Sequence, residues 1–496
     1  MNLRYLLHGV TAEPVAAIPV AGIACHSKQV RAGDLFVAIE GASMDGHVFI
    51  QEAIARGAAA IVAQRLPSTL GGGISIAQRA CPCVVVRDSR DALVTIATRF
   101  YGHPSRKLRL IGITGTNGKT TTTYLLKTIL EAAGFRAGLL GTIVYQIGDR
   151  RLPSTNTTPG PLELQRYFAQ MVGEGLQWCV MEVSSHALSQ GRIAGLEFEA
   201  AIFSNLGSDH LDYHKTRDAY AAAKRRLFDY LRPEGCAIIN TDDEYGRILA
   251  ETIPQCTVVT YGMERPAKAS VKHLQCSWRG IEMVLETPWG VTPITTPLVG
   301  RHNAWNVSAA ATTLMALGVA PSAIREGLAS LECVPGRLER VTNDLDVNLV
   351  IDYAHTADAL RLALLSLREL TRGRLIVVFG CGGNRDQTKR PIMGRMASLL
   401  ADHVILTSDN PRSEDPQMII QQIKSGFPPG CTQYDVVPDR EQSIVSALAM
   451  ARRDDTLLIA GKGHEAHQLF DHISVPFSDR DVVERWIASR HSVAIS

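Results

Sequence analysis

Short runs of consecutive apolar residues alternate along this chain with stretches whose apolar positions recur every three or four residues. The first pattern is typical of buried strands and the second of amphipathic helices. Strands that alternate with helices indicate parallel sheets with helices on both faces, so the expected fold class is α/β. The strand candidates are residues 35–39, 59–63, 108–113, 178–181, 200–203, 349–351, 375–379 and 403–406, and the helix candidates include 49–56, 359–370 and 440–452.

The length of 496 residues is too great for one hydrophobic core and predicts several domains. Residues 1–103 carry short alternating segments and a glycine-rich turn at 71–73. Residues 104–332 form a second block with three strand candidates, and residues 333–496 form a third block that begins around Pro335-Gly336. We therefore expect three domains, with a P-loop-type parallel sheet in the centre and a Rossmann-like domain at the C-terminal end.

Composition narrows the class of protein. Hydrophobic residues make up 46% and charged residues 20%, which is typical of globular proteins, and a net charge of +2 gives no reason to expect a nucleic acid or membrane partner. There is no apolar run of the roughly 18 residues that a spanning helix needs, and residues 1–8 have too short an apolar core for a signal peptide. The ten cysteines are scattered without a metal-binding or disulfide spacing. We expect a cytoplasmic monomer with reduced thiols.

The strand candidate 108–113 ends in a loop that runs into Gly118-Lys119-Thr120 and then into a helical pattern ending near Gly134. A strand, a glycine loop, a lysine and a helix are how P-loop proteins hold a nucleotide triphosphate. Backbone N–H groups point at the phosphates, the lysine reaches the β and γ oxygens, and the threonine hydroxyl binds Mg²⁺. The phosphate-binding candidates are Gly115, Thr116, Asn117, Gly118, Lys119, Thr120 and Thr121.

This loop departs from the usual P-loop pattern, because Ile113 occupies the place of the first glycine. The alternative is an ordinary turn between a strand and a helix. The position of Gly-Lys-Thr, where both the strand pattern and the helix pattern require it, favours a P-loop variant.

Candidate metal ligands follow two further predicted strands. Glu182 follows the strand 178–181, where a Mg²⁺ ligand belongs in a P-loop sheet. After the strand 200–203, residues 209–214 hold two histidines and two aspartates. A zinc site is an alternative there, but no cysteine and no helical His-x₃-His spacing accompany it, so a second oxygen-rich metal position is favoured. On the helix predicted at 219–228, Lys224 taken alone is a solvated surface lysine.

Five stretches together resemble the Mur ligases of bacterial cell-wall synthesis, and the resemblance covers nearly the whole chain. They are Thr-Gly-Thr-Asn-Gly-Lys-Thr at 114–120, Glu-Val-Ser-Ser-His at 182–186, Asp-His-Leu-Asp-Tyr-His at 209–214, Gly-Arg-His-Asn at 300–303 and Asp-Tyr-Ala-His-Thr at 352–356. These enzymes activate a carboxylate with ATP as an acyl phosphate, which an incoming amine converts into an amide.

The resemblance implies ATP and Mg²⁺ as cofactors and assigns roles to residues. It implies a catalytic and metal-binding set of Lys119, Thr120, Glu182, His210 and Lys224, with Lys224 carbamylated by CO₂. A carbamate turns a cation into an anionic group with two oxygens, which suits Mg²⁺. It also places Asn303, Arg337 and Asp352 near the nucleotide, with His355 lining the same cleft. Ala357 stands where the family usually has proline.

Another motif bears on which amine is added. Asp409-Asn410-Pro411-Arg412 resembles the signature of the family members that add meso-diaminopimelate, and members that add L-lysine carry a different tetrapeptide. Diaminopimelate has a second carboxylate, for which Arg412 offers a planar fork. Arg385, Gly461 and Glu465 match other contacts to this amino acid, and Glu465 suits its distal ammonium. Asn384 stands where aspartate is more usual.

The implied acceptor is UDP-N-acetylmuramoyl-L-alanyl-D-glutamate, bound through its uridine by the N-terminal domain. Hydroxyl, amide and guanidinium groups suit such an anionic, oxygen-rich ligand. His26-Ser27-Lys28 departs from the usual Asp-Ser-Arg at the uridine contact but keeps the serine. The matching positions are Ser27, Ala42, Ser43, Met44, Asn156, Thr157, Thr158, Ser184, Gln190 and Arg192.

Other functions remain open at this point. Folylpolyglutamate synthase, a related ligase with the same ATP chemistry, lacks the N-terminal block and the Asp-Asn-Pro-Arg signature. A non-catalytic nucleotide-binding protein would be expected to lose Lys119, Glu182 or His210, and all three are present. A plain P-loop kinase does not explain a third domain.

Overall fold

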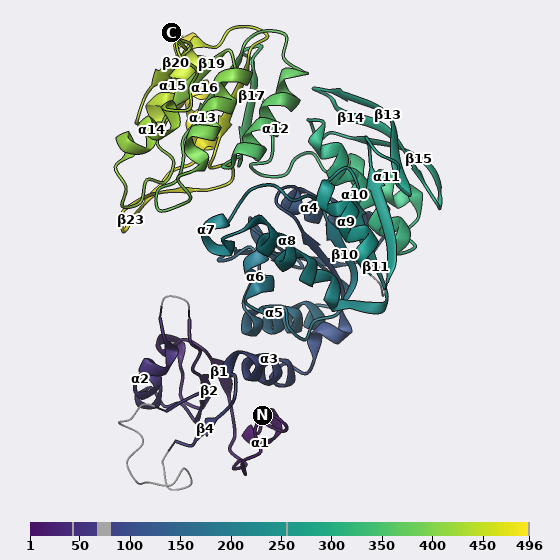
Figure 1. The fold of residues 1–496 in the computed structure, drawn as a ribbon, viewed down its shortest axis with the longest axis vertical. Helices are drawn as coiled ribbons and strands as arrows, with labels where there is room; N and C mark the ends of the chain where they lie inside the picture. Colours follow the sequence, from purple (N-terminus) through teal and green to yellow (C-terminus); the bar gives the residue numbers. More distant parts are fainter. Residues whose placement is uncertain (42–43, 67–80, 254–255, 495–496) are drawn as a thin grey trace. The chain divides into compact units, whose positions relative to one another are not determined.

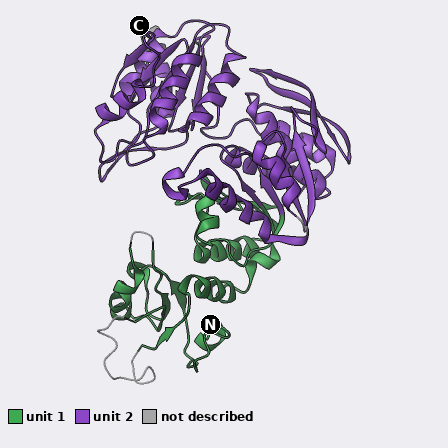
Figure 2. Ribbon diagram, viewed as in Figure 1, with its two compact units in different colours: residues 1–111, 136–140, 144–199 green, residues 112–135, 141–143, 200–496 purple. Residues whose placement is uncertain are grey.

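The computed structural model describes residues 1–41, 44–66, 81–253 and 256–494. By internal contacts the chain divides into two compact units (Figure 2). Unit 1 comprises residues 1–111, 136–140 and 144–199, and unit 2 comprises residues 112–135, 141–143 and 200–496. Strands β5 (Arg109–Thr114) and β10 (Phe198–Phe203) each cross from unit 1 into unit 2.

Unit 1 begins with a four-stranded parallel sheet in the order β1-β2-β3-β4. Its central strands confirm the apolar runs predicted at 35–39 and 59–63, and every residue of both strands is buried. The glycine-rich turn predicted at 71–73 lies outside the described residues. The elements are α1 (Leu3–Leu6), β1 (Gly22–Ala24), β2 (Asp34–Val37), α2 (Ile50–Ala55), β3 (Ala60–Ala63), β4 (Cys83–Val85) and α3 (Ser89–Phe100).

The second part of unit 1 has neighbouring strands in the order β9-β6-β7-β8. β9 pairs in parallel with β6, and β6, β7 and β8 form an antiparallel meander. The buried strand β9 carries Glu182 as its last residue, as the apolar run before it predicted. The elements are β6 (Ala137–Leu140), β7 (Val144–Ile147), β8 (Arg150–Pro153), α5 (Pro161–Gly173), β9 (Trp178–Glu182) and α6 (Ser185–Ser189).

Unit 2 opens with the helix after the P-loop, α4 (Lys119–Ala132), which packs against α10 (His302–Ala316) and α11 (Pro321–Ser330). Helices α11 and α4 pack closely, since a Cβ on Gly327 of α11 would lie 2.5 Å from the Cα of Ile129 in α4. The next elements are α7 (Leu211–His214), α8 (Arg217–Arg225), β11 (Leu231–Asn240), α9 (Glu244–Thr252), β12 (Thr257–Gly262), β13 (Ala269–Ser277), β14 (Gly280–Thr287) and β15 (Gly290–Thr296).

The rest of unit 2 is a six-stranded sheet in the order β16-β17-β21-β18-β19-β20. Only β16 is antiparallel to its neighbour, so the carboxyl ends of β17, β18, β19 and β21 lie at one edge. The strands are β16 (Glu339–Val341), β17 (Asn348–Asp352), β18 (Leu375–Phe379), β19 (His403–Leu406), β20 (Tyr434–Val436) and β21 (Thr456–Ala460), and a separate hairpin joins β22 (His467–Phe470) to β23 (Ile473–Pro476).

Helices cover both faces of this sheet (Figure 1). One hydrophobic core joins the sheet to α12, α13 and α14, and a second joins it to α15 and α16. This doubly covered sheet confirms the predicted α/β class. The domain boundaries near residues 103 and 332 stay predictions. The helices are α12 (Ala357–Arg368), α13 (Lys389–Leu400), α14 (Pro416–Lys424), α15 (Arg440–Met450) and α16 (Asp479–Ala494).

Two expectations from composition can be compared with the structure. All ten cysteines lie in the described part of the chain, and each carries a free thiol. Among the described residues, no helix combines the length and the apolar character needed to cross a membrane.

Candidate active site

The predicted P-loop lies between the end of β5 and the start of α4, as the sequence pattern requires. Its two glycines have positive φ angles, +145° at Gly115 and +88° at Gly118. A Cβ on Gly115 would lie 1.9 Å from Ser204 Oγ, and one on Gly118 would lie 2.3 Å from Asn306 Oδ1. Both positions therefore require glycine for their backbone conformation and for space.

The segment that follows β10 holds the P-loop in place. The backbone N–H of Asn117 donates to Asn205 Oδ1 at 2.9 Å, and Ser204 Oγ donates to the carbonyl of Asn117 at 2.6 Å. The N–H of Gly207 donates to Thr116 Oγ1 at 2.9 Å. In the first turn of α4, the predicted phosphate and metal contacts Thr120 and Thr121 are buried. The loop is thus fixed before any ligand binds, which reduces the ordering cost of phosphate binding.

Two lysines converge on this loop. Lys119 Nζ donates to the carbonyls of Gly115 and Thr116, both at 2.8 Å, and Lys224 Nζ donates to the carbonyl of Gly115 at 2.7 Å. The reading of Lys224 as a surface lysine is wrong, because only 1% of it is exposed and its Nζ lies 4.2 Å from the ring centroid of Tyr220. Burial, followed by the charge of Lys119, lowers the pKa of Lys224 well below its ordinary value.

His210 lies between β10 and α7 with a left-handed backbone, φ +55°. Burial lowers its pKa to about 4, although Asp209 opposes the shift, so the imidazole is neutral at pH 7. A neutral imidazole is the form that binds a metal. Within the described ranges there is no group of three or more His, Cys, Asp or Glu side chains that could hold a metal ion. Three of the predicted metal ligands, Thr120, His210 and Lys224, belong to unit 2.

The turn before β16 brings Arg337 to the P-loop. Its Nη2 donates to Thr120 Oγ1 at 3.1 Å, and its guanidinium carbon lies 4.5 Å from the ring centroid of Tyr353. The Asp352 carboxylate accepts the backbone N–H of Leu338 at 2.6 Å and that of Ala354 at 2.8 Å, so it orders the loop that carries Arg337.

Two other residues expected near the nucleotide, Asn303 and His355, form hydrogen bonds within the protein. Asn303 Nδ2 donates to the carbonyl of Val299 at 2.7 Å, and its Oδ1 accepts a hydrogen bond from Asn306 at 2.8 Å. The Asn306 side chain lies against Gly118 and so connects Asn303 to the P-loop. His355 Nδ1 lies 2.9 Å from the carbonyl of Tyr353.

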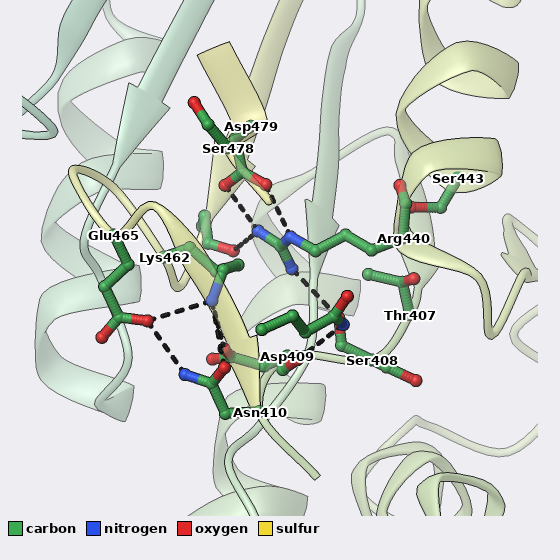
Figure 3. A network of polar contacts seen from close by, with 12 residues as sticks. Thr407, Ser408, Asp409, Asn410, Arg440, Ser443, Lys462, Glu465, Ser478 and Asp479 are labelled. Carbon is green, nitrogen blue, oxygen red and sulfur yellow. Dashed lines mark hydrogen bonds and ion pairs between the residues drawn. The ribbon is translucent and has the colours of Figure 1, made fainter. Parts of the chain in front are cut away.

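The Asp409–Arg412 segment follows β19 at the edge where the parallel strands end (Figure 3). Asn410 Nδ2 donates to Glu465 Oε2 at 2.9 Å. Lys462 Nζ donates to Asn410 Oδ1 at 3.1 Å and to Glu465 Oε2 at 3.0 Å. The structure therefore brings together Asp409, Asn410, Glu465 and the loop at Gly461, all of which the sequence predicted as amino-acid contacts.

Two arginines lie beside this network. Arg412 adopts φ +52°, and its Nη1 donates to the carbonyl of Gly383 at 2.7 Å. A Cβ on Gly382 would lie 3.0 Å from Arg412 Nη1 and 3.8 Å from the Cγ of Arg385, so both side chains pass the same glycine. Burial, then the nearby charge of Arg385, lowers the pKa of Arg412. The positive charges of the two arginines thus act on each other, and such a pair favours an anionic ligand.

Sequence reasoning missed the buried charges beneath this segment. Arg440 and Asp479 have fully buried side chains and form an ion pair at 2.7 Å, and Arg440 also donates to the carbonyls of Ser408 and Ala460. Lys462 stands between Gly461 and Gly463, and this glycine spacing is the signal in the sequence that it lies in a tight loop. No local pattern marks Arg440, because its partners lie 20 to 39 positions away.

Unit 1 brings together four of the predicted acceptor contacts, Thr158, Ser184, Gln190 and Arg192. Thr158 Oγ1 donates to the carbonyl of Glu182 at 2.9 Å and accepts the N–H of Ser184 at 3.0 Å. Arg192 Nη1 donates to the carbonyl of Thr158 at 2.8 Å, and its Nε donates to Gln190 Oε1 at 2.9 Å. The Glu182 side chain is buried at the end of β9.

The other predicted acceptor contacts include the two residues that precede Thr158. Asn156, which follows β8, is bonded through its backbone to the hydroxyl of Tyr145, and Thr157 follows it in the chain. Ser27 is buried in a short 3₁₀ helix whose N-cap is His26, and Met44 is exposed. Ala42 and Ser43 lie outside the described residues. The structure leaves the roles of these residues as predictions.

Comparison with known proteins gives three family matches along the chain. Residues 19–101 match the Mur ligase family catalytic domain, residues 113–314 match the Mur ligase middle domain, and residues 336–463 match the Mur ligase glutamate ligase domain.

Similar proteins cover nearly the whole chain. A UDP-N-acetylmuramoyl-L-alanyl-D-glutamate–2,6-diaminopimelate ligase of Geobacillus kaustophilus is 42% identical, with 95% of each chain covered. A ligase of the same name from Gloeobacter violaceus is 43% identical, with 99% of each covered. A solved structure of a ligase with this name has a TM-score of 0.69 at 31% identity, covering 99% of both chains. The chain belongs to the Mur ligase family.

Proposed function

We propose that this chain is an ATP-dependent ligase that joins meso-2,6-diaminopimelate to the D-glutamate carboxylate of UDP-N-acetylmuramoyl-L-alanyl-D-glutamate. The reaction serves the synthesis of bacterial peptidoglycan. The observation that carries the proposal is the pair Arg412 and Arg385 beside Glu465, on a chain that is 42% identical to a ligase with this printed activity. The two arginines offer a site for an anion, and Glu465 offers a site for a cation.

The reaction proceeds in two steps. A carboxylate oxygen of D-glutamate attacks the γ-phosphorus of ATP, which forms an acyl phosphate and releases ADP. The amine of diaminopimelate then attacks the acyl carbon, the carbon–oxygen bond to phosphate breaks, and the nitrogen loses a proton. Phosphoryl transfer needs positioning and charge neutralisation more than covalent help from the protein.

The chain supplies these functions near the P-loop. Backbone N–H groups of the P-loop and of the start of α4 hold the phosphates, and Lys119 turns from its loop carbonyls towards the β and γ oxygens. Arg337 is placed to neutralise the phosphate that Thr120 faces. Mg²⁺, when bound, neutralises phosphate charge, and Thr120, Glu182, His210 and carbamylated Lys224 are its proposed ligands.

The choice of amine follows from the charges at the ends of β18, β19 and β21. Diaminopimelate carries both an ammonium and a carboxylate at its distal end, whereas L-lysine carries the ammonium alone. Arg412 and Arg385 match the extra carboxylate, and Glu465 matches the ammonium. With L-lysine, both guanidinium groups would be left without an anionic partner. This difference favours diaminopimelate over lysine as the substrate.

A folylpolyglutamate synthase-like reaction is the second candidate, since it uses the same ATP chemistry. The N-terminal sheet β1–β4 argues against it, because that ligase type lacks an N-terminal UDP-binding block. We further propose that the enzyme is a monomer in the cytoplasm, with small molecules as its partners and with no role for nucleic acid or membrane.

The test is a phosphate-release assay with purified enzyme, ATP and UDP-N-acetylmuramoyl-L-alanyl-D-glutamate. Parallel reactions receive meso-diaminopimelate, L-lysine or L-glutamate, and the nucleotide-linked product is identified by mass. We expect kcat/KM for diaminopimelate to exceed that for lysine by at least about 100-fold, since an unpaired guanidinium costs several kcal/mol. A preference for lysine would overturn the choice of amine, and turnover of a folate substrate in place of the UDP-linked dipeptide would overturn the acceptor.

A further inference from the structure

Lys462 is a fully buried lysine for which the proposed reaction has no step. Its side chain has 0% exposure, and it lies in the loop after β21, two residues beyond the end of that strand. A buried ammonium is costly unless charges and hydrogen bonds compensate it. Each compensating group belongs to the candidate amino-acid site (Figure 3).

The partners of Lys462 come from two loops. Nζ donates to Glu465 Oε2 at 3.0 Å within its own loop and to Asn410 Oδ1 at 3.1 Å in the loop after β19. Asp409 Oδ1 lies 3.8 Å away, and this buried oxygen has no hydrogen-bond partner among the described residues. Because β18 separates β19 from β21 in the sheet, Lys462 links two loops that are not neighbours in the strand order.

The same contacts fix the orientation of Glu465. Its Oε2 accepts hydrogen bonds from both Lys462 and Asn410, while its other oxygen points away from them in Figure 3. That second oxygen, Oε1, accepts a hydrogen bond from the hydroxyl of Tyr353 at 3.4 Å, which leaves one of its two lone pairs. Glu465 therefore turns Oε2 inward, and the remaining lone pair of Oε1 can accept from a ligand.

The charges support this arrangement. Arg440 and Asp479 neutralise each other, which leaves Lys462 to balance both Asp409 and Glu465. Within this buried set of five groups one negative charge remains for the distal ammonium, while the nearby charges of Arg412 and Arg385 are left for the distal carboxylate. Burial by itself would raise the pKa of Glu465, but the charge of Lys462 and the hydrogen bonds from Asn410 and Lys462 lower it. Glu465 is thus kept ionised.

We infer that Lys462 is a positioning residue of the amino-acid site, which holds the Glu465 carboxylate ionised and turned so that Oε1 receives the distal ammonium of the incoming amino acid. The inference rests on the proposed function, because it concerns how that same site selects its amine. Lys462 acts through Glu465 and does not touch the substrate.

The test is a double-mutant cycle of Lys462→Met and Glu465→Gln, with KM for diaminopimelate as the readout. If Lys462 acts through Glu465, Lys462→Met raises this KM by about tenfold or more in the native background and by less than about twofold in Glu465→Gln. KM for ATP stays within about twofold, because ATP binds at the P-loop. Lys424→Met, which removes an exposed lysine of α14, is the matched control and leaves both KM values unchanged.

A second readout separates positioning from a general packing defect. Without Lys462, the pKa of Glu465 rises, so KM of the Lys462→Met enzyme increases as the pH falls from about 8.5 to about 6, while that of Glu465→Gln stays flat. The other titratable groups facing Glu465 are Tyr353, Asp409, Arg412, Arg440 and His464, and both variants retain them.

Each result has a defined meaning. Lack of diaminopimelate turnover by the native enzyme would overturn the proposed function and this inference together. Native turnover with equal effects of Lys462→Met in both backgrounds, or with an unchanged KM, would overturn the inference alone. If Lys462→Met does not fold, Lys462→Gln takes its place in the native background. It is then compared with the Lys462→Met/Glu465→Gln enzyme, which loses one charge of each sign. An unchanged KM for diaminopimelate, or an equal effect in both backgrounds, would again overturn the inference.

Discussion

Arg337 Nη2 lies 3.1 Å from Thr120 Oγ1, although 217 positions separate the two residues in the chain. Thr120 lies in the first turn of α4, and Arg337 lies in the turn before β16, where Asp352 orders the backbone. Among the described residues, Arg337 Nε is buried without a hydrogen-bond partner. A half-buried guanidinium with a spare donor, in contact with the predicted magnesium ligand, is placed to bind a phosphate oxygen.

Replacing Arg337 with alanine should weaken ATP binding. Loss of a charge-assisted hydrogen bond costs about 1.5–3 kcal/mol, so we expect KM for ATP to rise by roughly 10- to 100-fold. KM for the amino acid should stay within about twofold. Steady-state kinetics with each substrate varied in turn checks the prediction. Arg340→Ala, which removes an exposed arginine three residues later, is the control. An unchanged KM for ATP would remove Arg337 from the nucleotide site.

The second prediction is that activity depends on a carbamate at Lys224. In the carbamate, Nζ keeps one hydrogen and can still donate to Gly115, while the added CO₂ supplies two anionic oxygens. Lys224→Ala should lower kcat by at least about 100-fold, because the charge on the phosphates is then less well neutralised. Formate, acetate or propionate should restore part of the activity by filling the vacated space with a carboxylate.

The control for Lys224 is Lys272→Ala, which removes an exposed lysine on β13 and should leave kcat unchanged with or without added acid. Labelling the native enzyme with ¹³C-bicarbonate should give one carbamate signal that Lys224→Ala lacks. Full activity of Lys224→Ala without rescue would show that no carbamate is needed.

Lys224 also shows where prediction from the sequence ends. Apolar runs in the sequence predicted β5, β9, β10, β18 and β19, because a strand buried on both faces consists of consecutive apolar residues. The helical pattern around Lys224 is compatible with a surface position, and only packing against the P-loop buries it. Charge networks such as Lys462 with Asn410 depend on strand order, which local patterns do not encode.

Arg412→Lys should separate the amino-acid site from the nucleotide site. Lysine keeps the charge but loses the planar fork, and Arg412 holds a positive φ angle that leaves its side chain little room to readjust. We expect KM for diaminopimelate to rise by about 10- to 100-fold with KM for ATP unchanged. Lysine as substrate should be affected far less, since it has no distal carboxylate. An unchanged KM for diaminopimelate would show that Arg412 does not bind that carboxylate.

The buried pair Arg440 and Asp479 supports a prediction about stability. Its two side chains are fully buried, and Arg440 connects the chain after β19 to the end of β21 through the carbonyls of Ser408 and Ala460. Arg440→Met leaves Asp479 buried without its partner, which typically costs about 3–5 kcal/mol. The midpoint of urea unfolding should fall accordingly, and the contact between the two loops of the amino-acid site should be lost with it.

The matched control is Arg485→Met, because Arg485 forms an ion pair of similar length with Glu441, 2.6 Å, with side chains 60% and 53% exposed. Exposed pairs contribute about 1 kcal/mol or less, so this variant should unfold near the native midpoint. The double variant Arg440→Met/Asp479→Leu removes both buried charges and should recover much of the lost stability, since the desolvation cost of the pair disappears with them. Equal midpoints for Arg440→Met and Arg485→Met would mean that burial adds nothing to the Arg440–Asp479 pair.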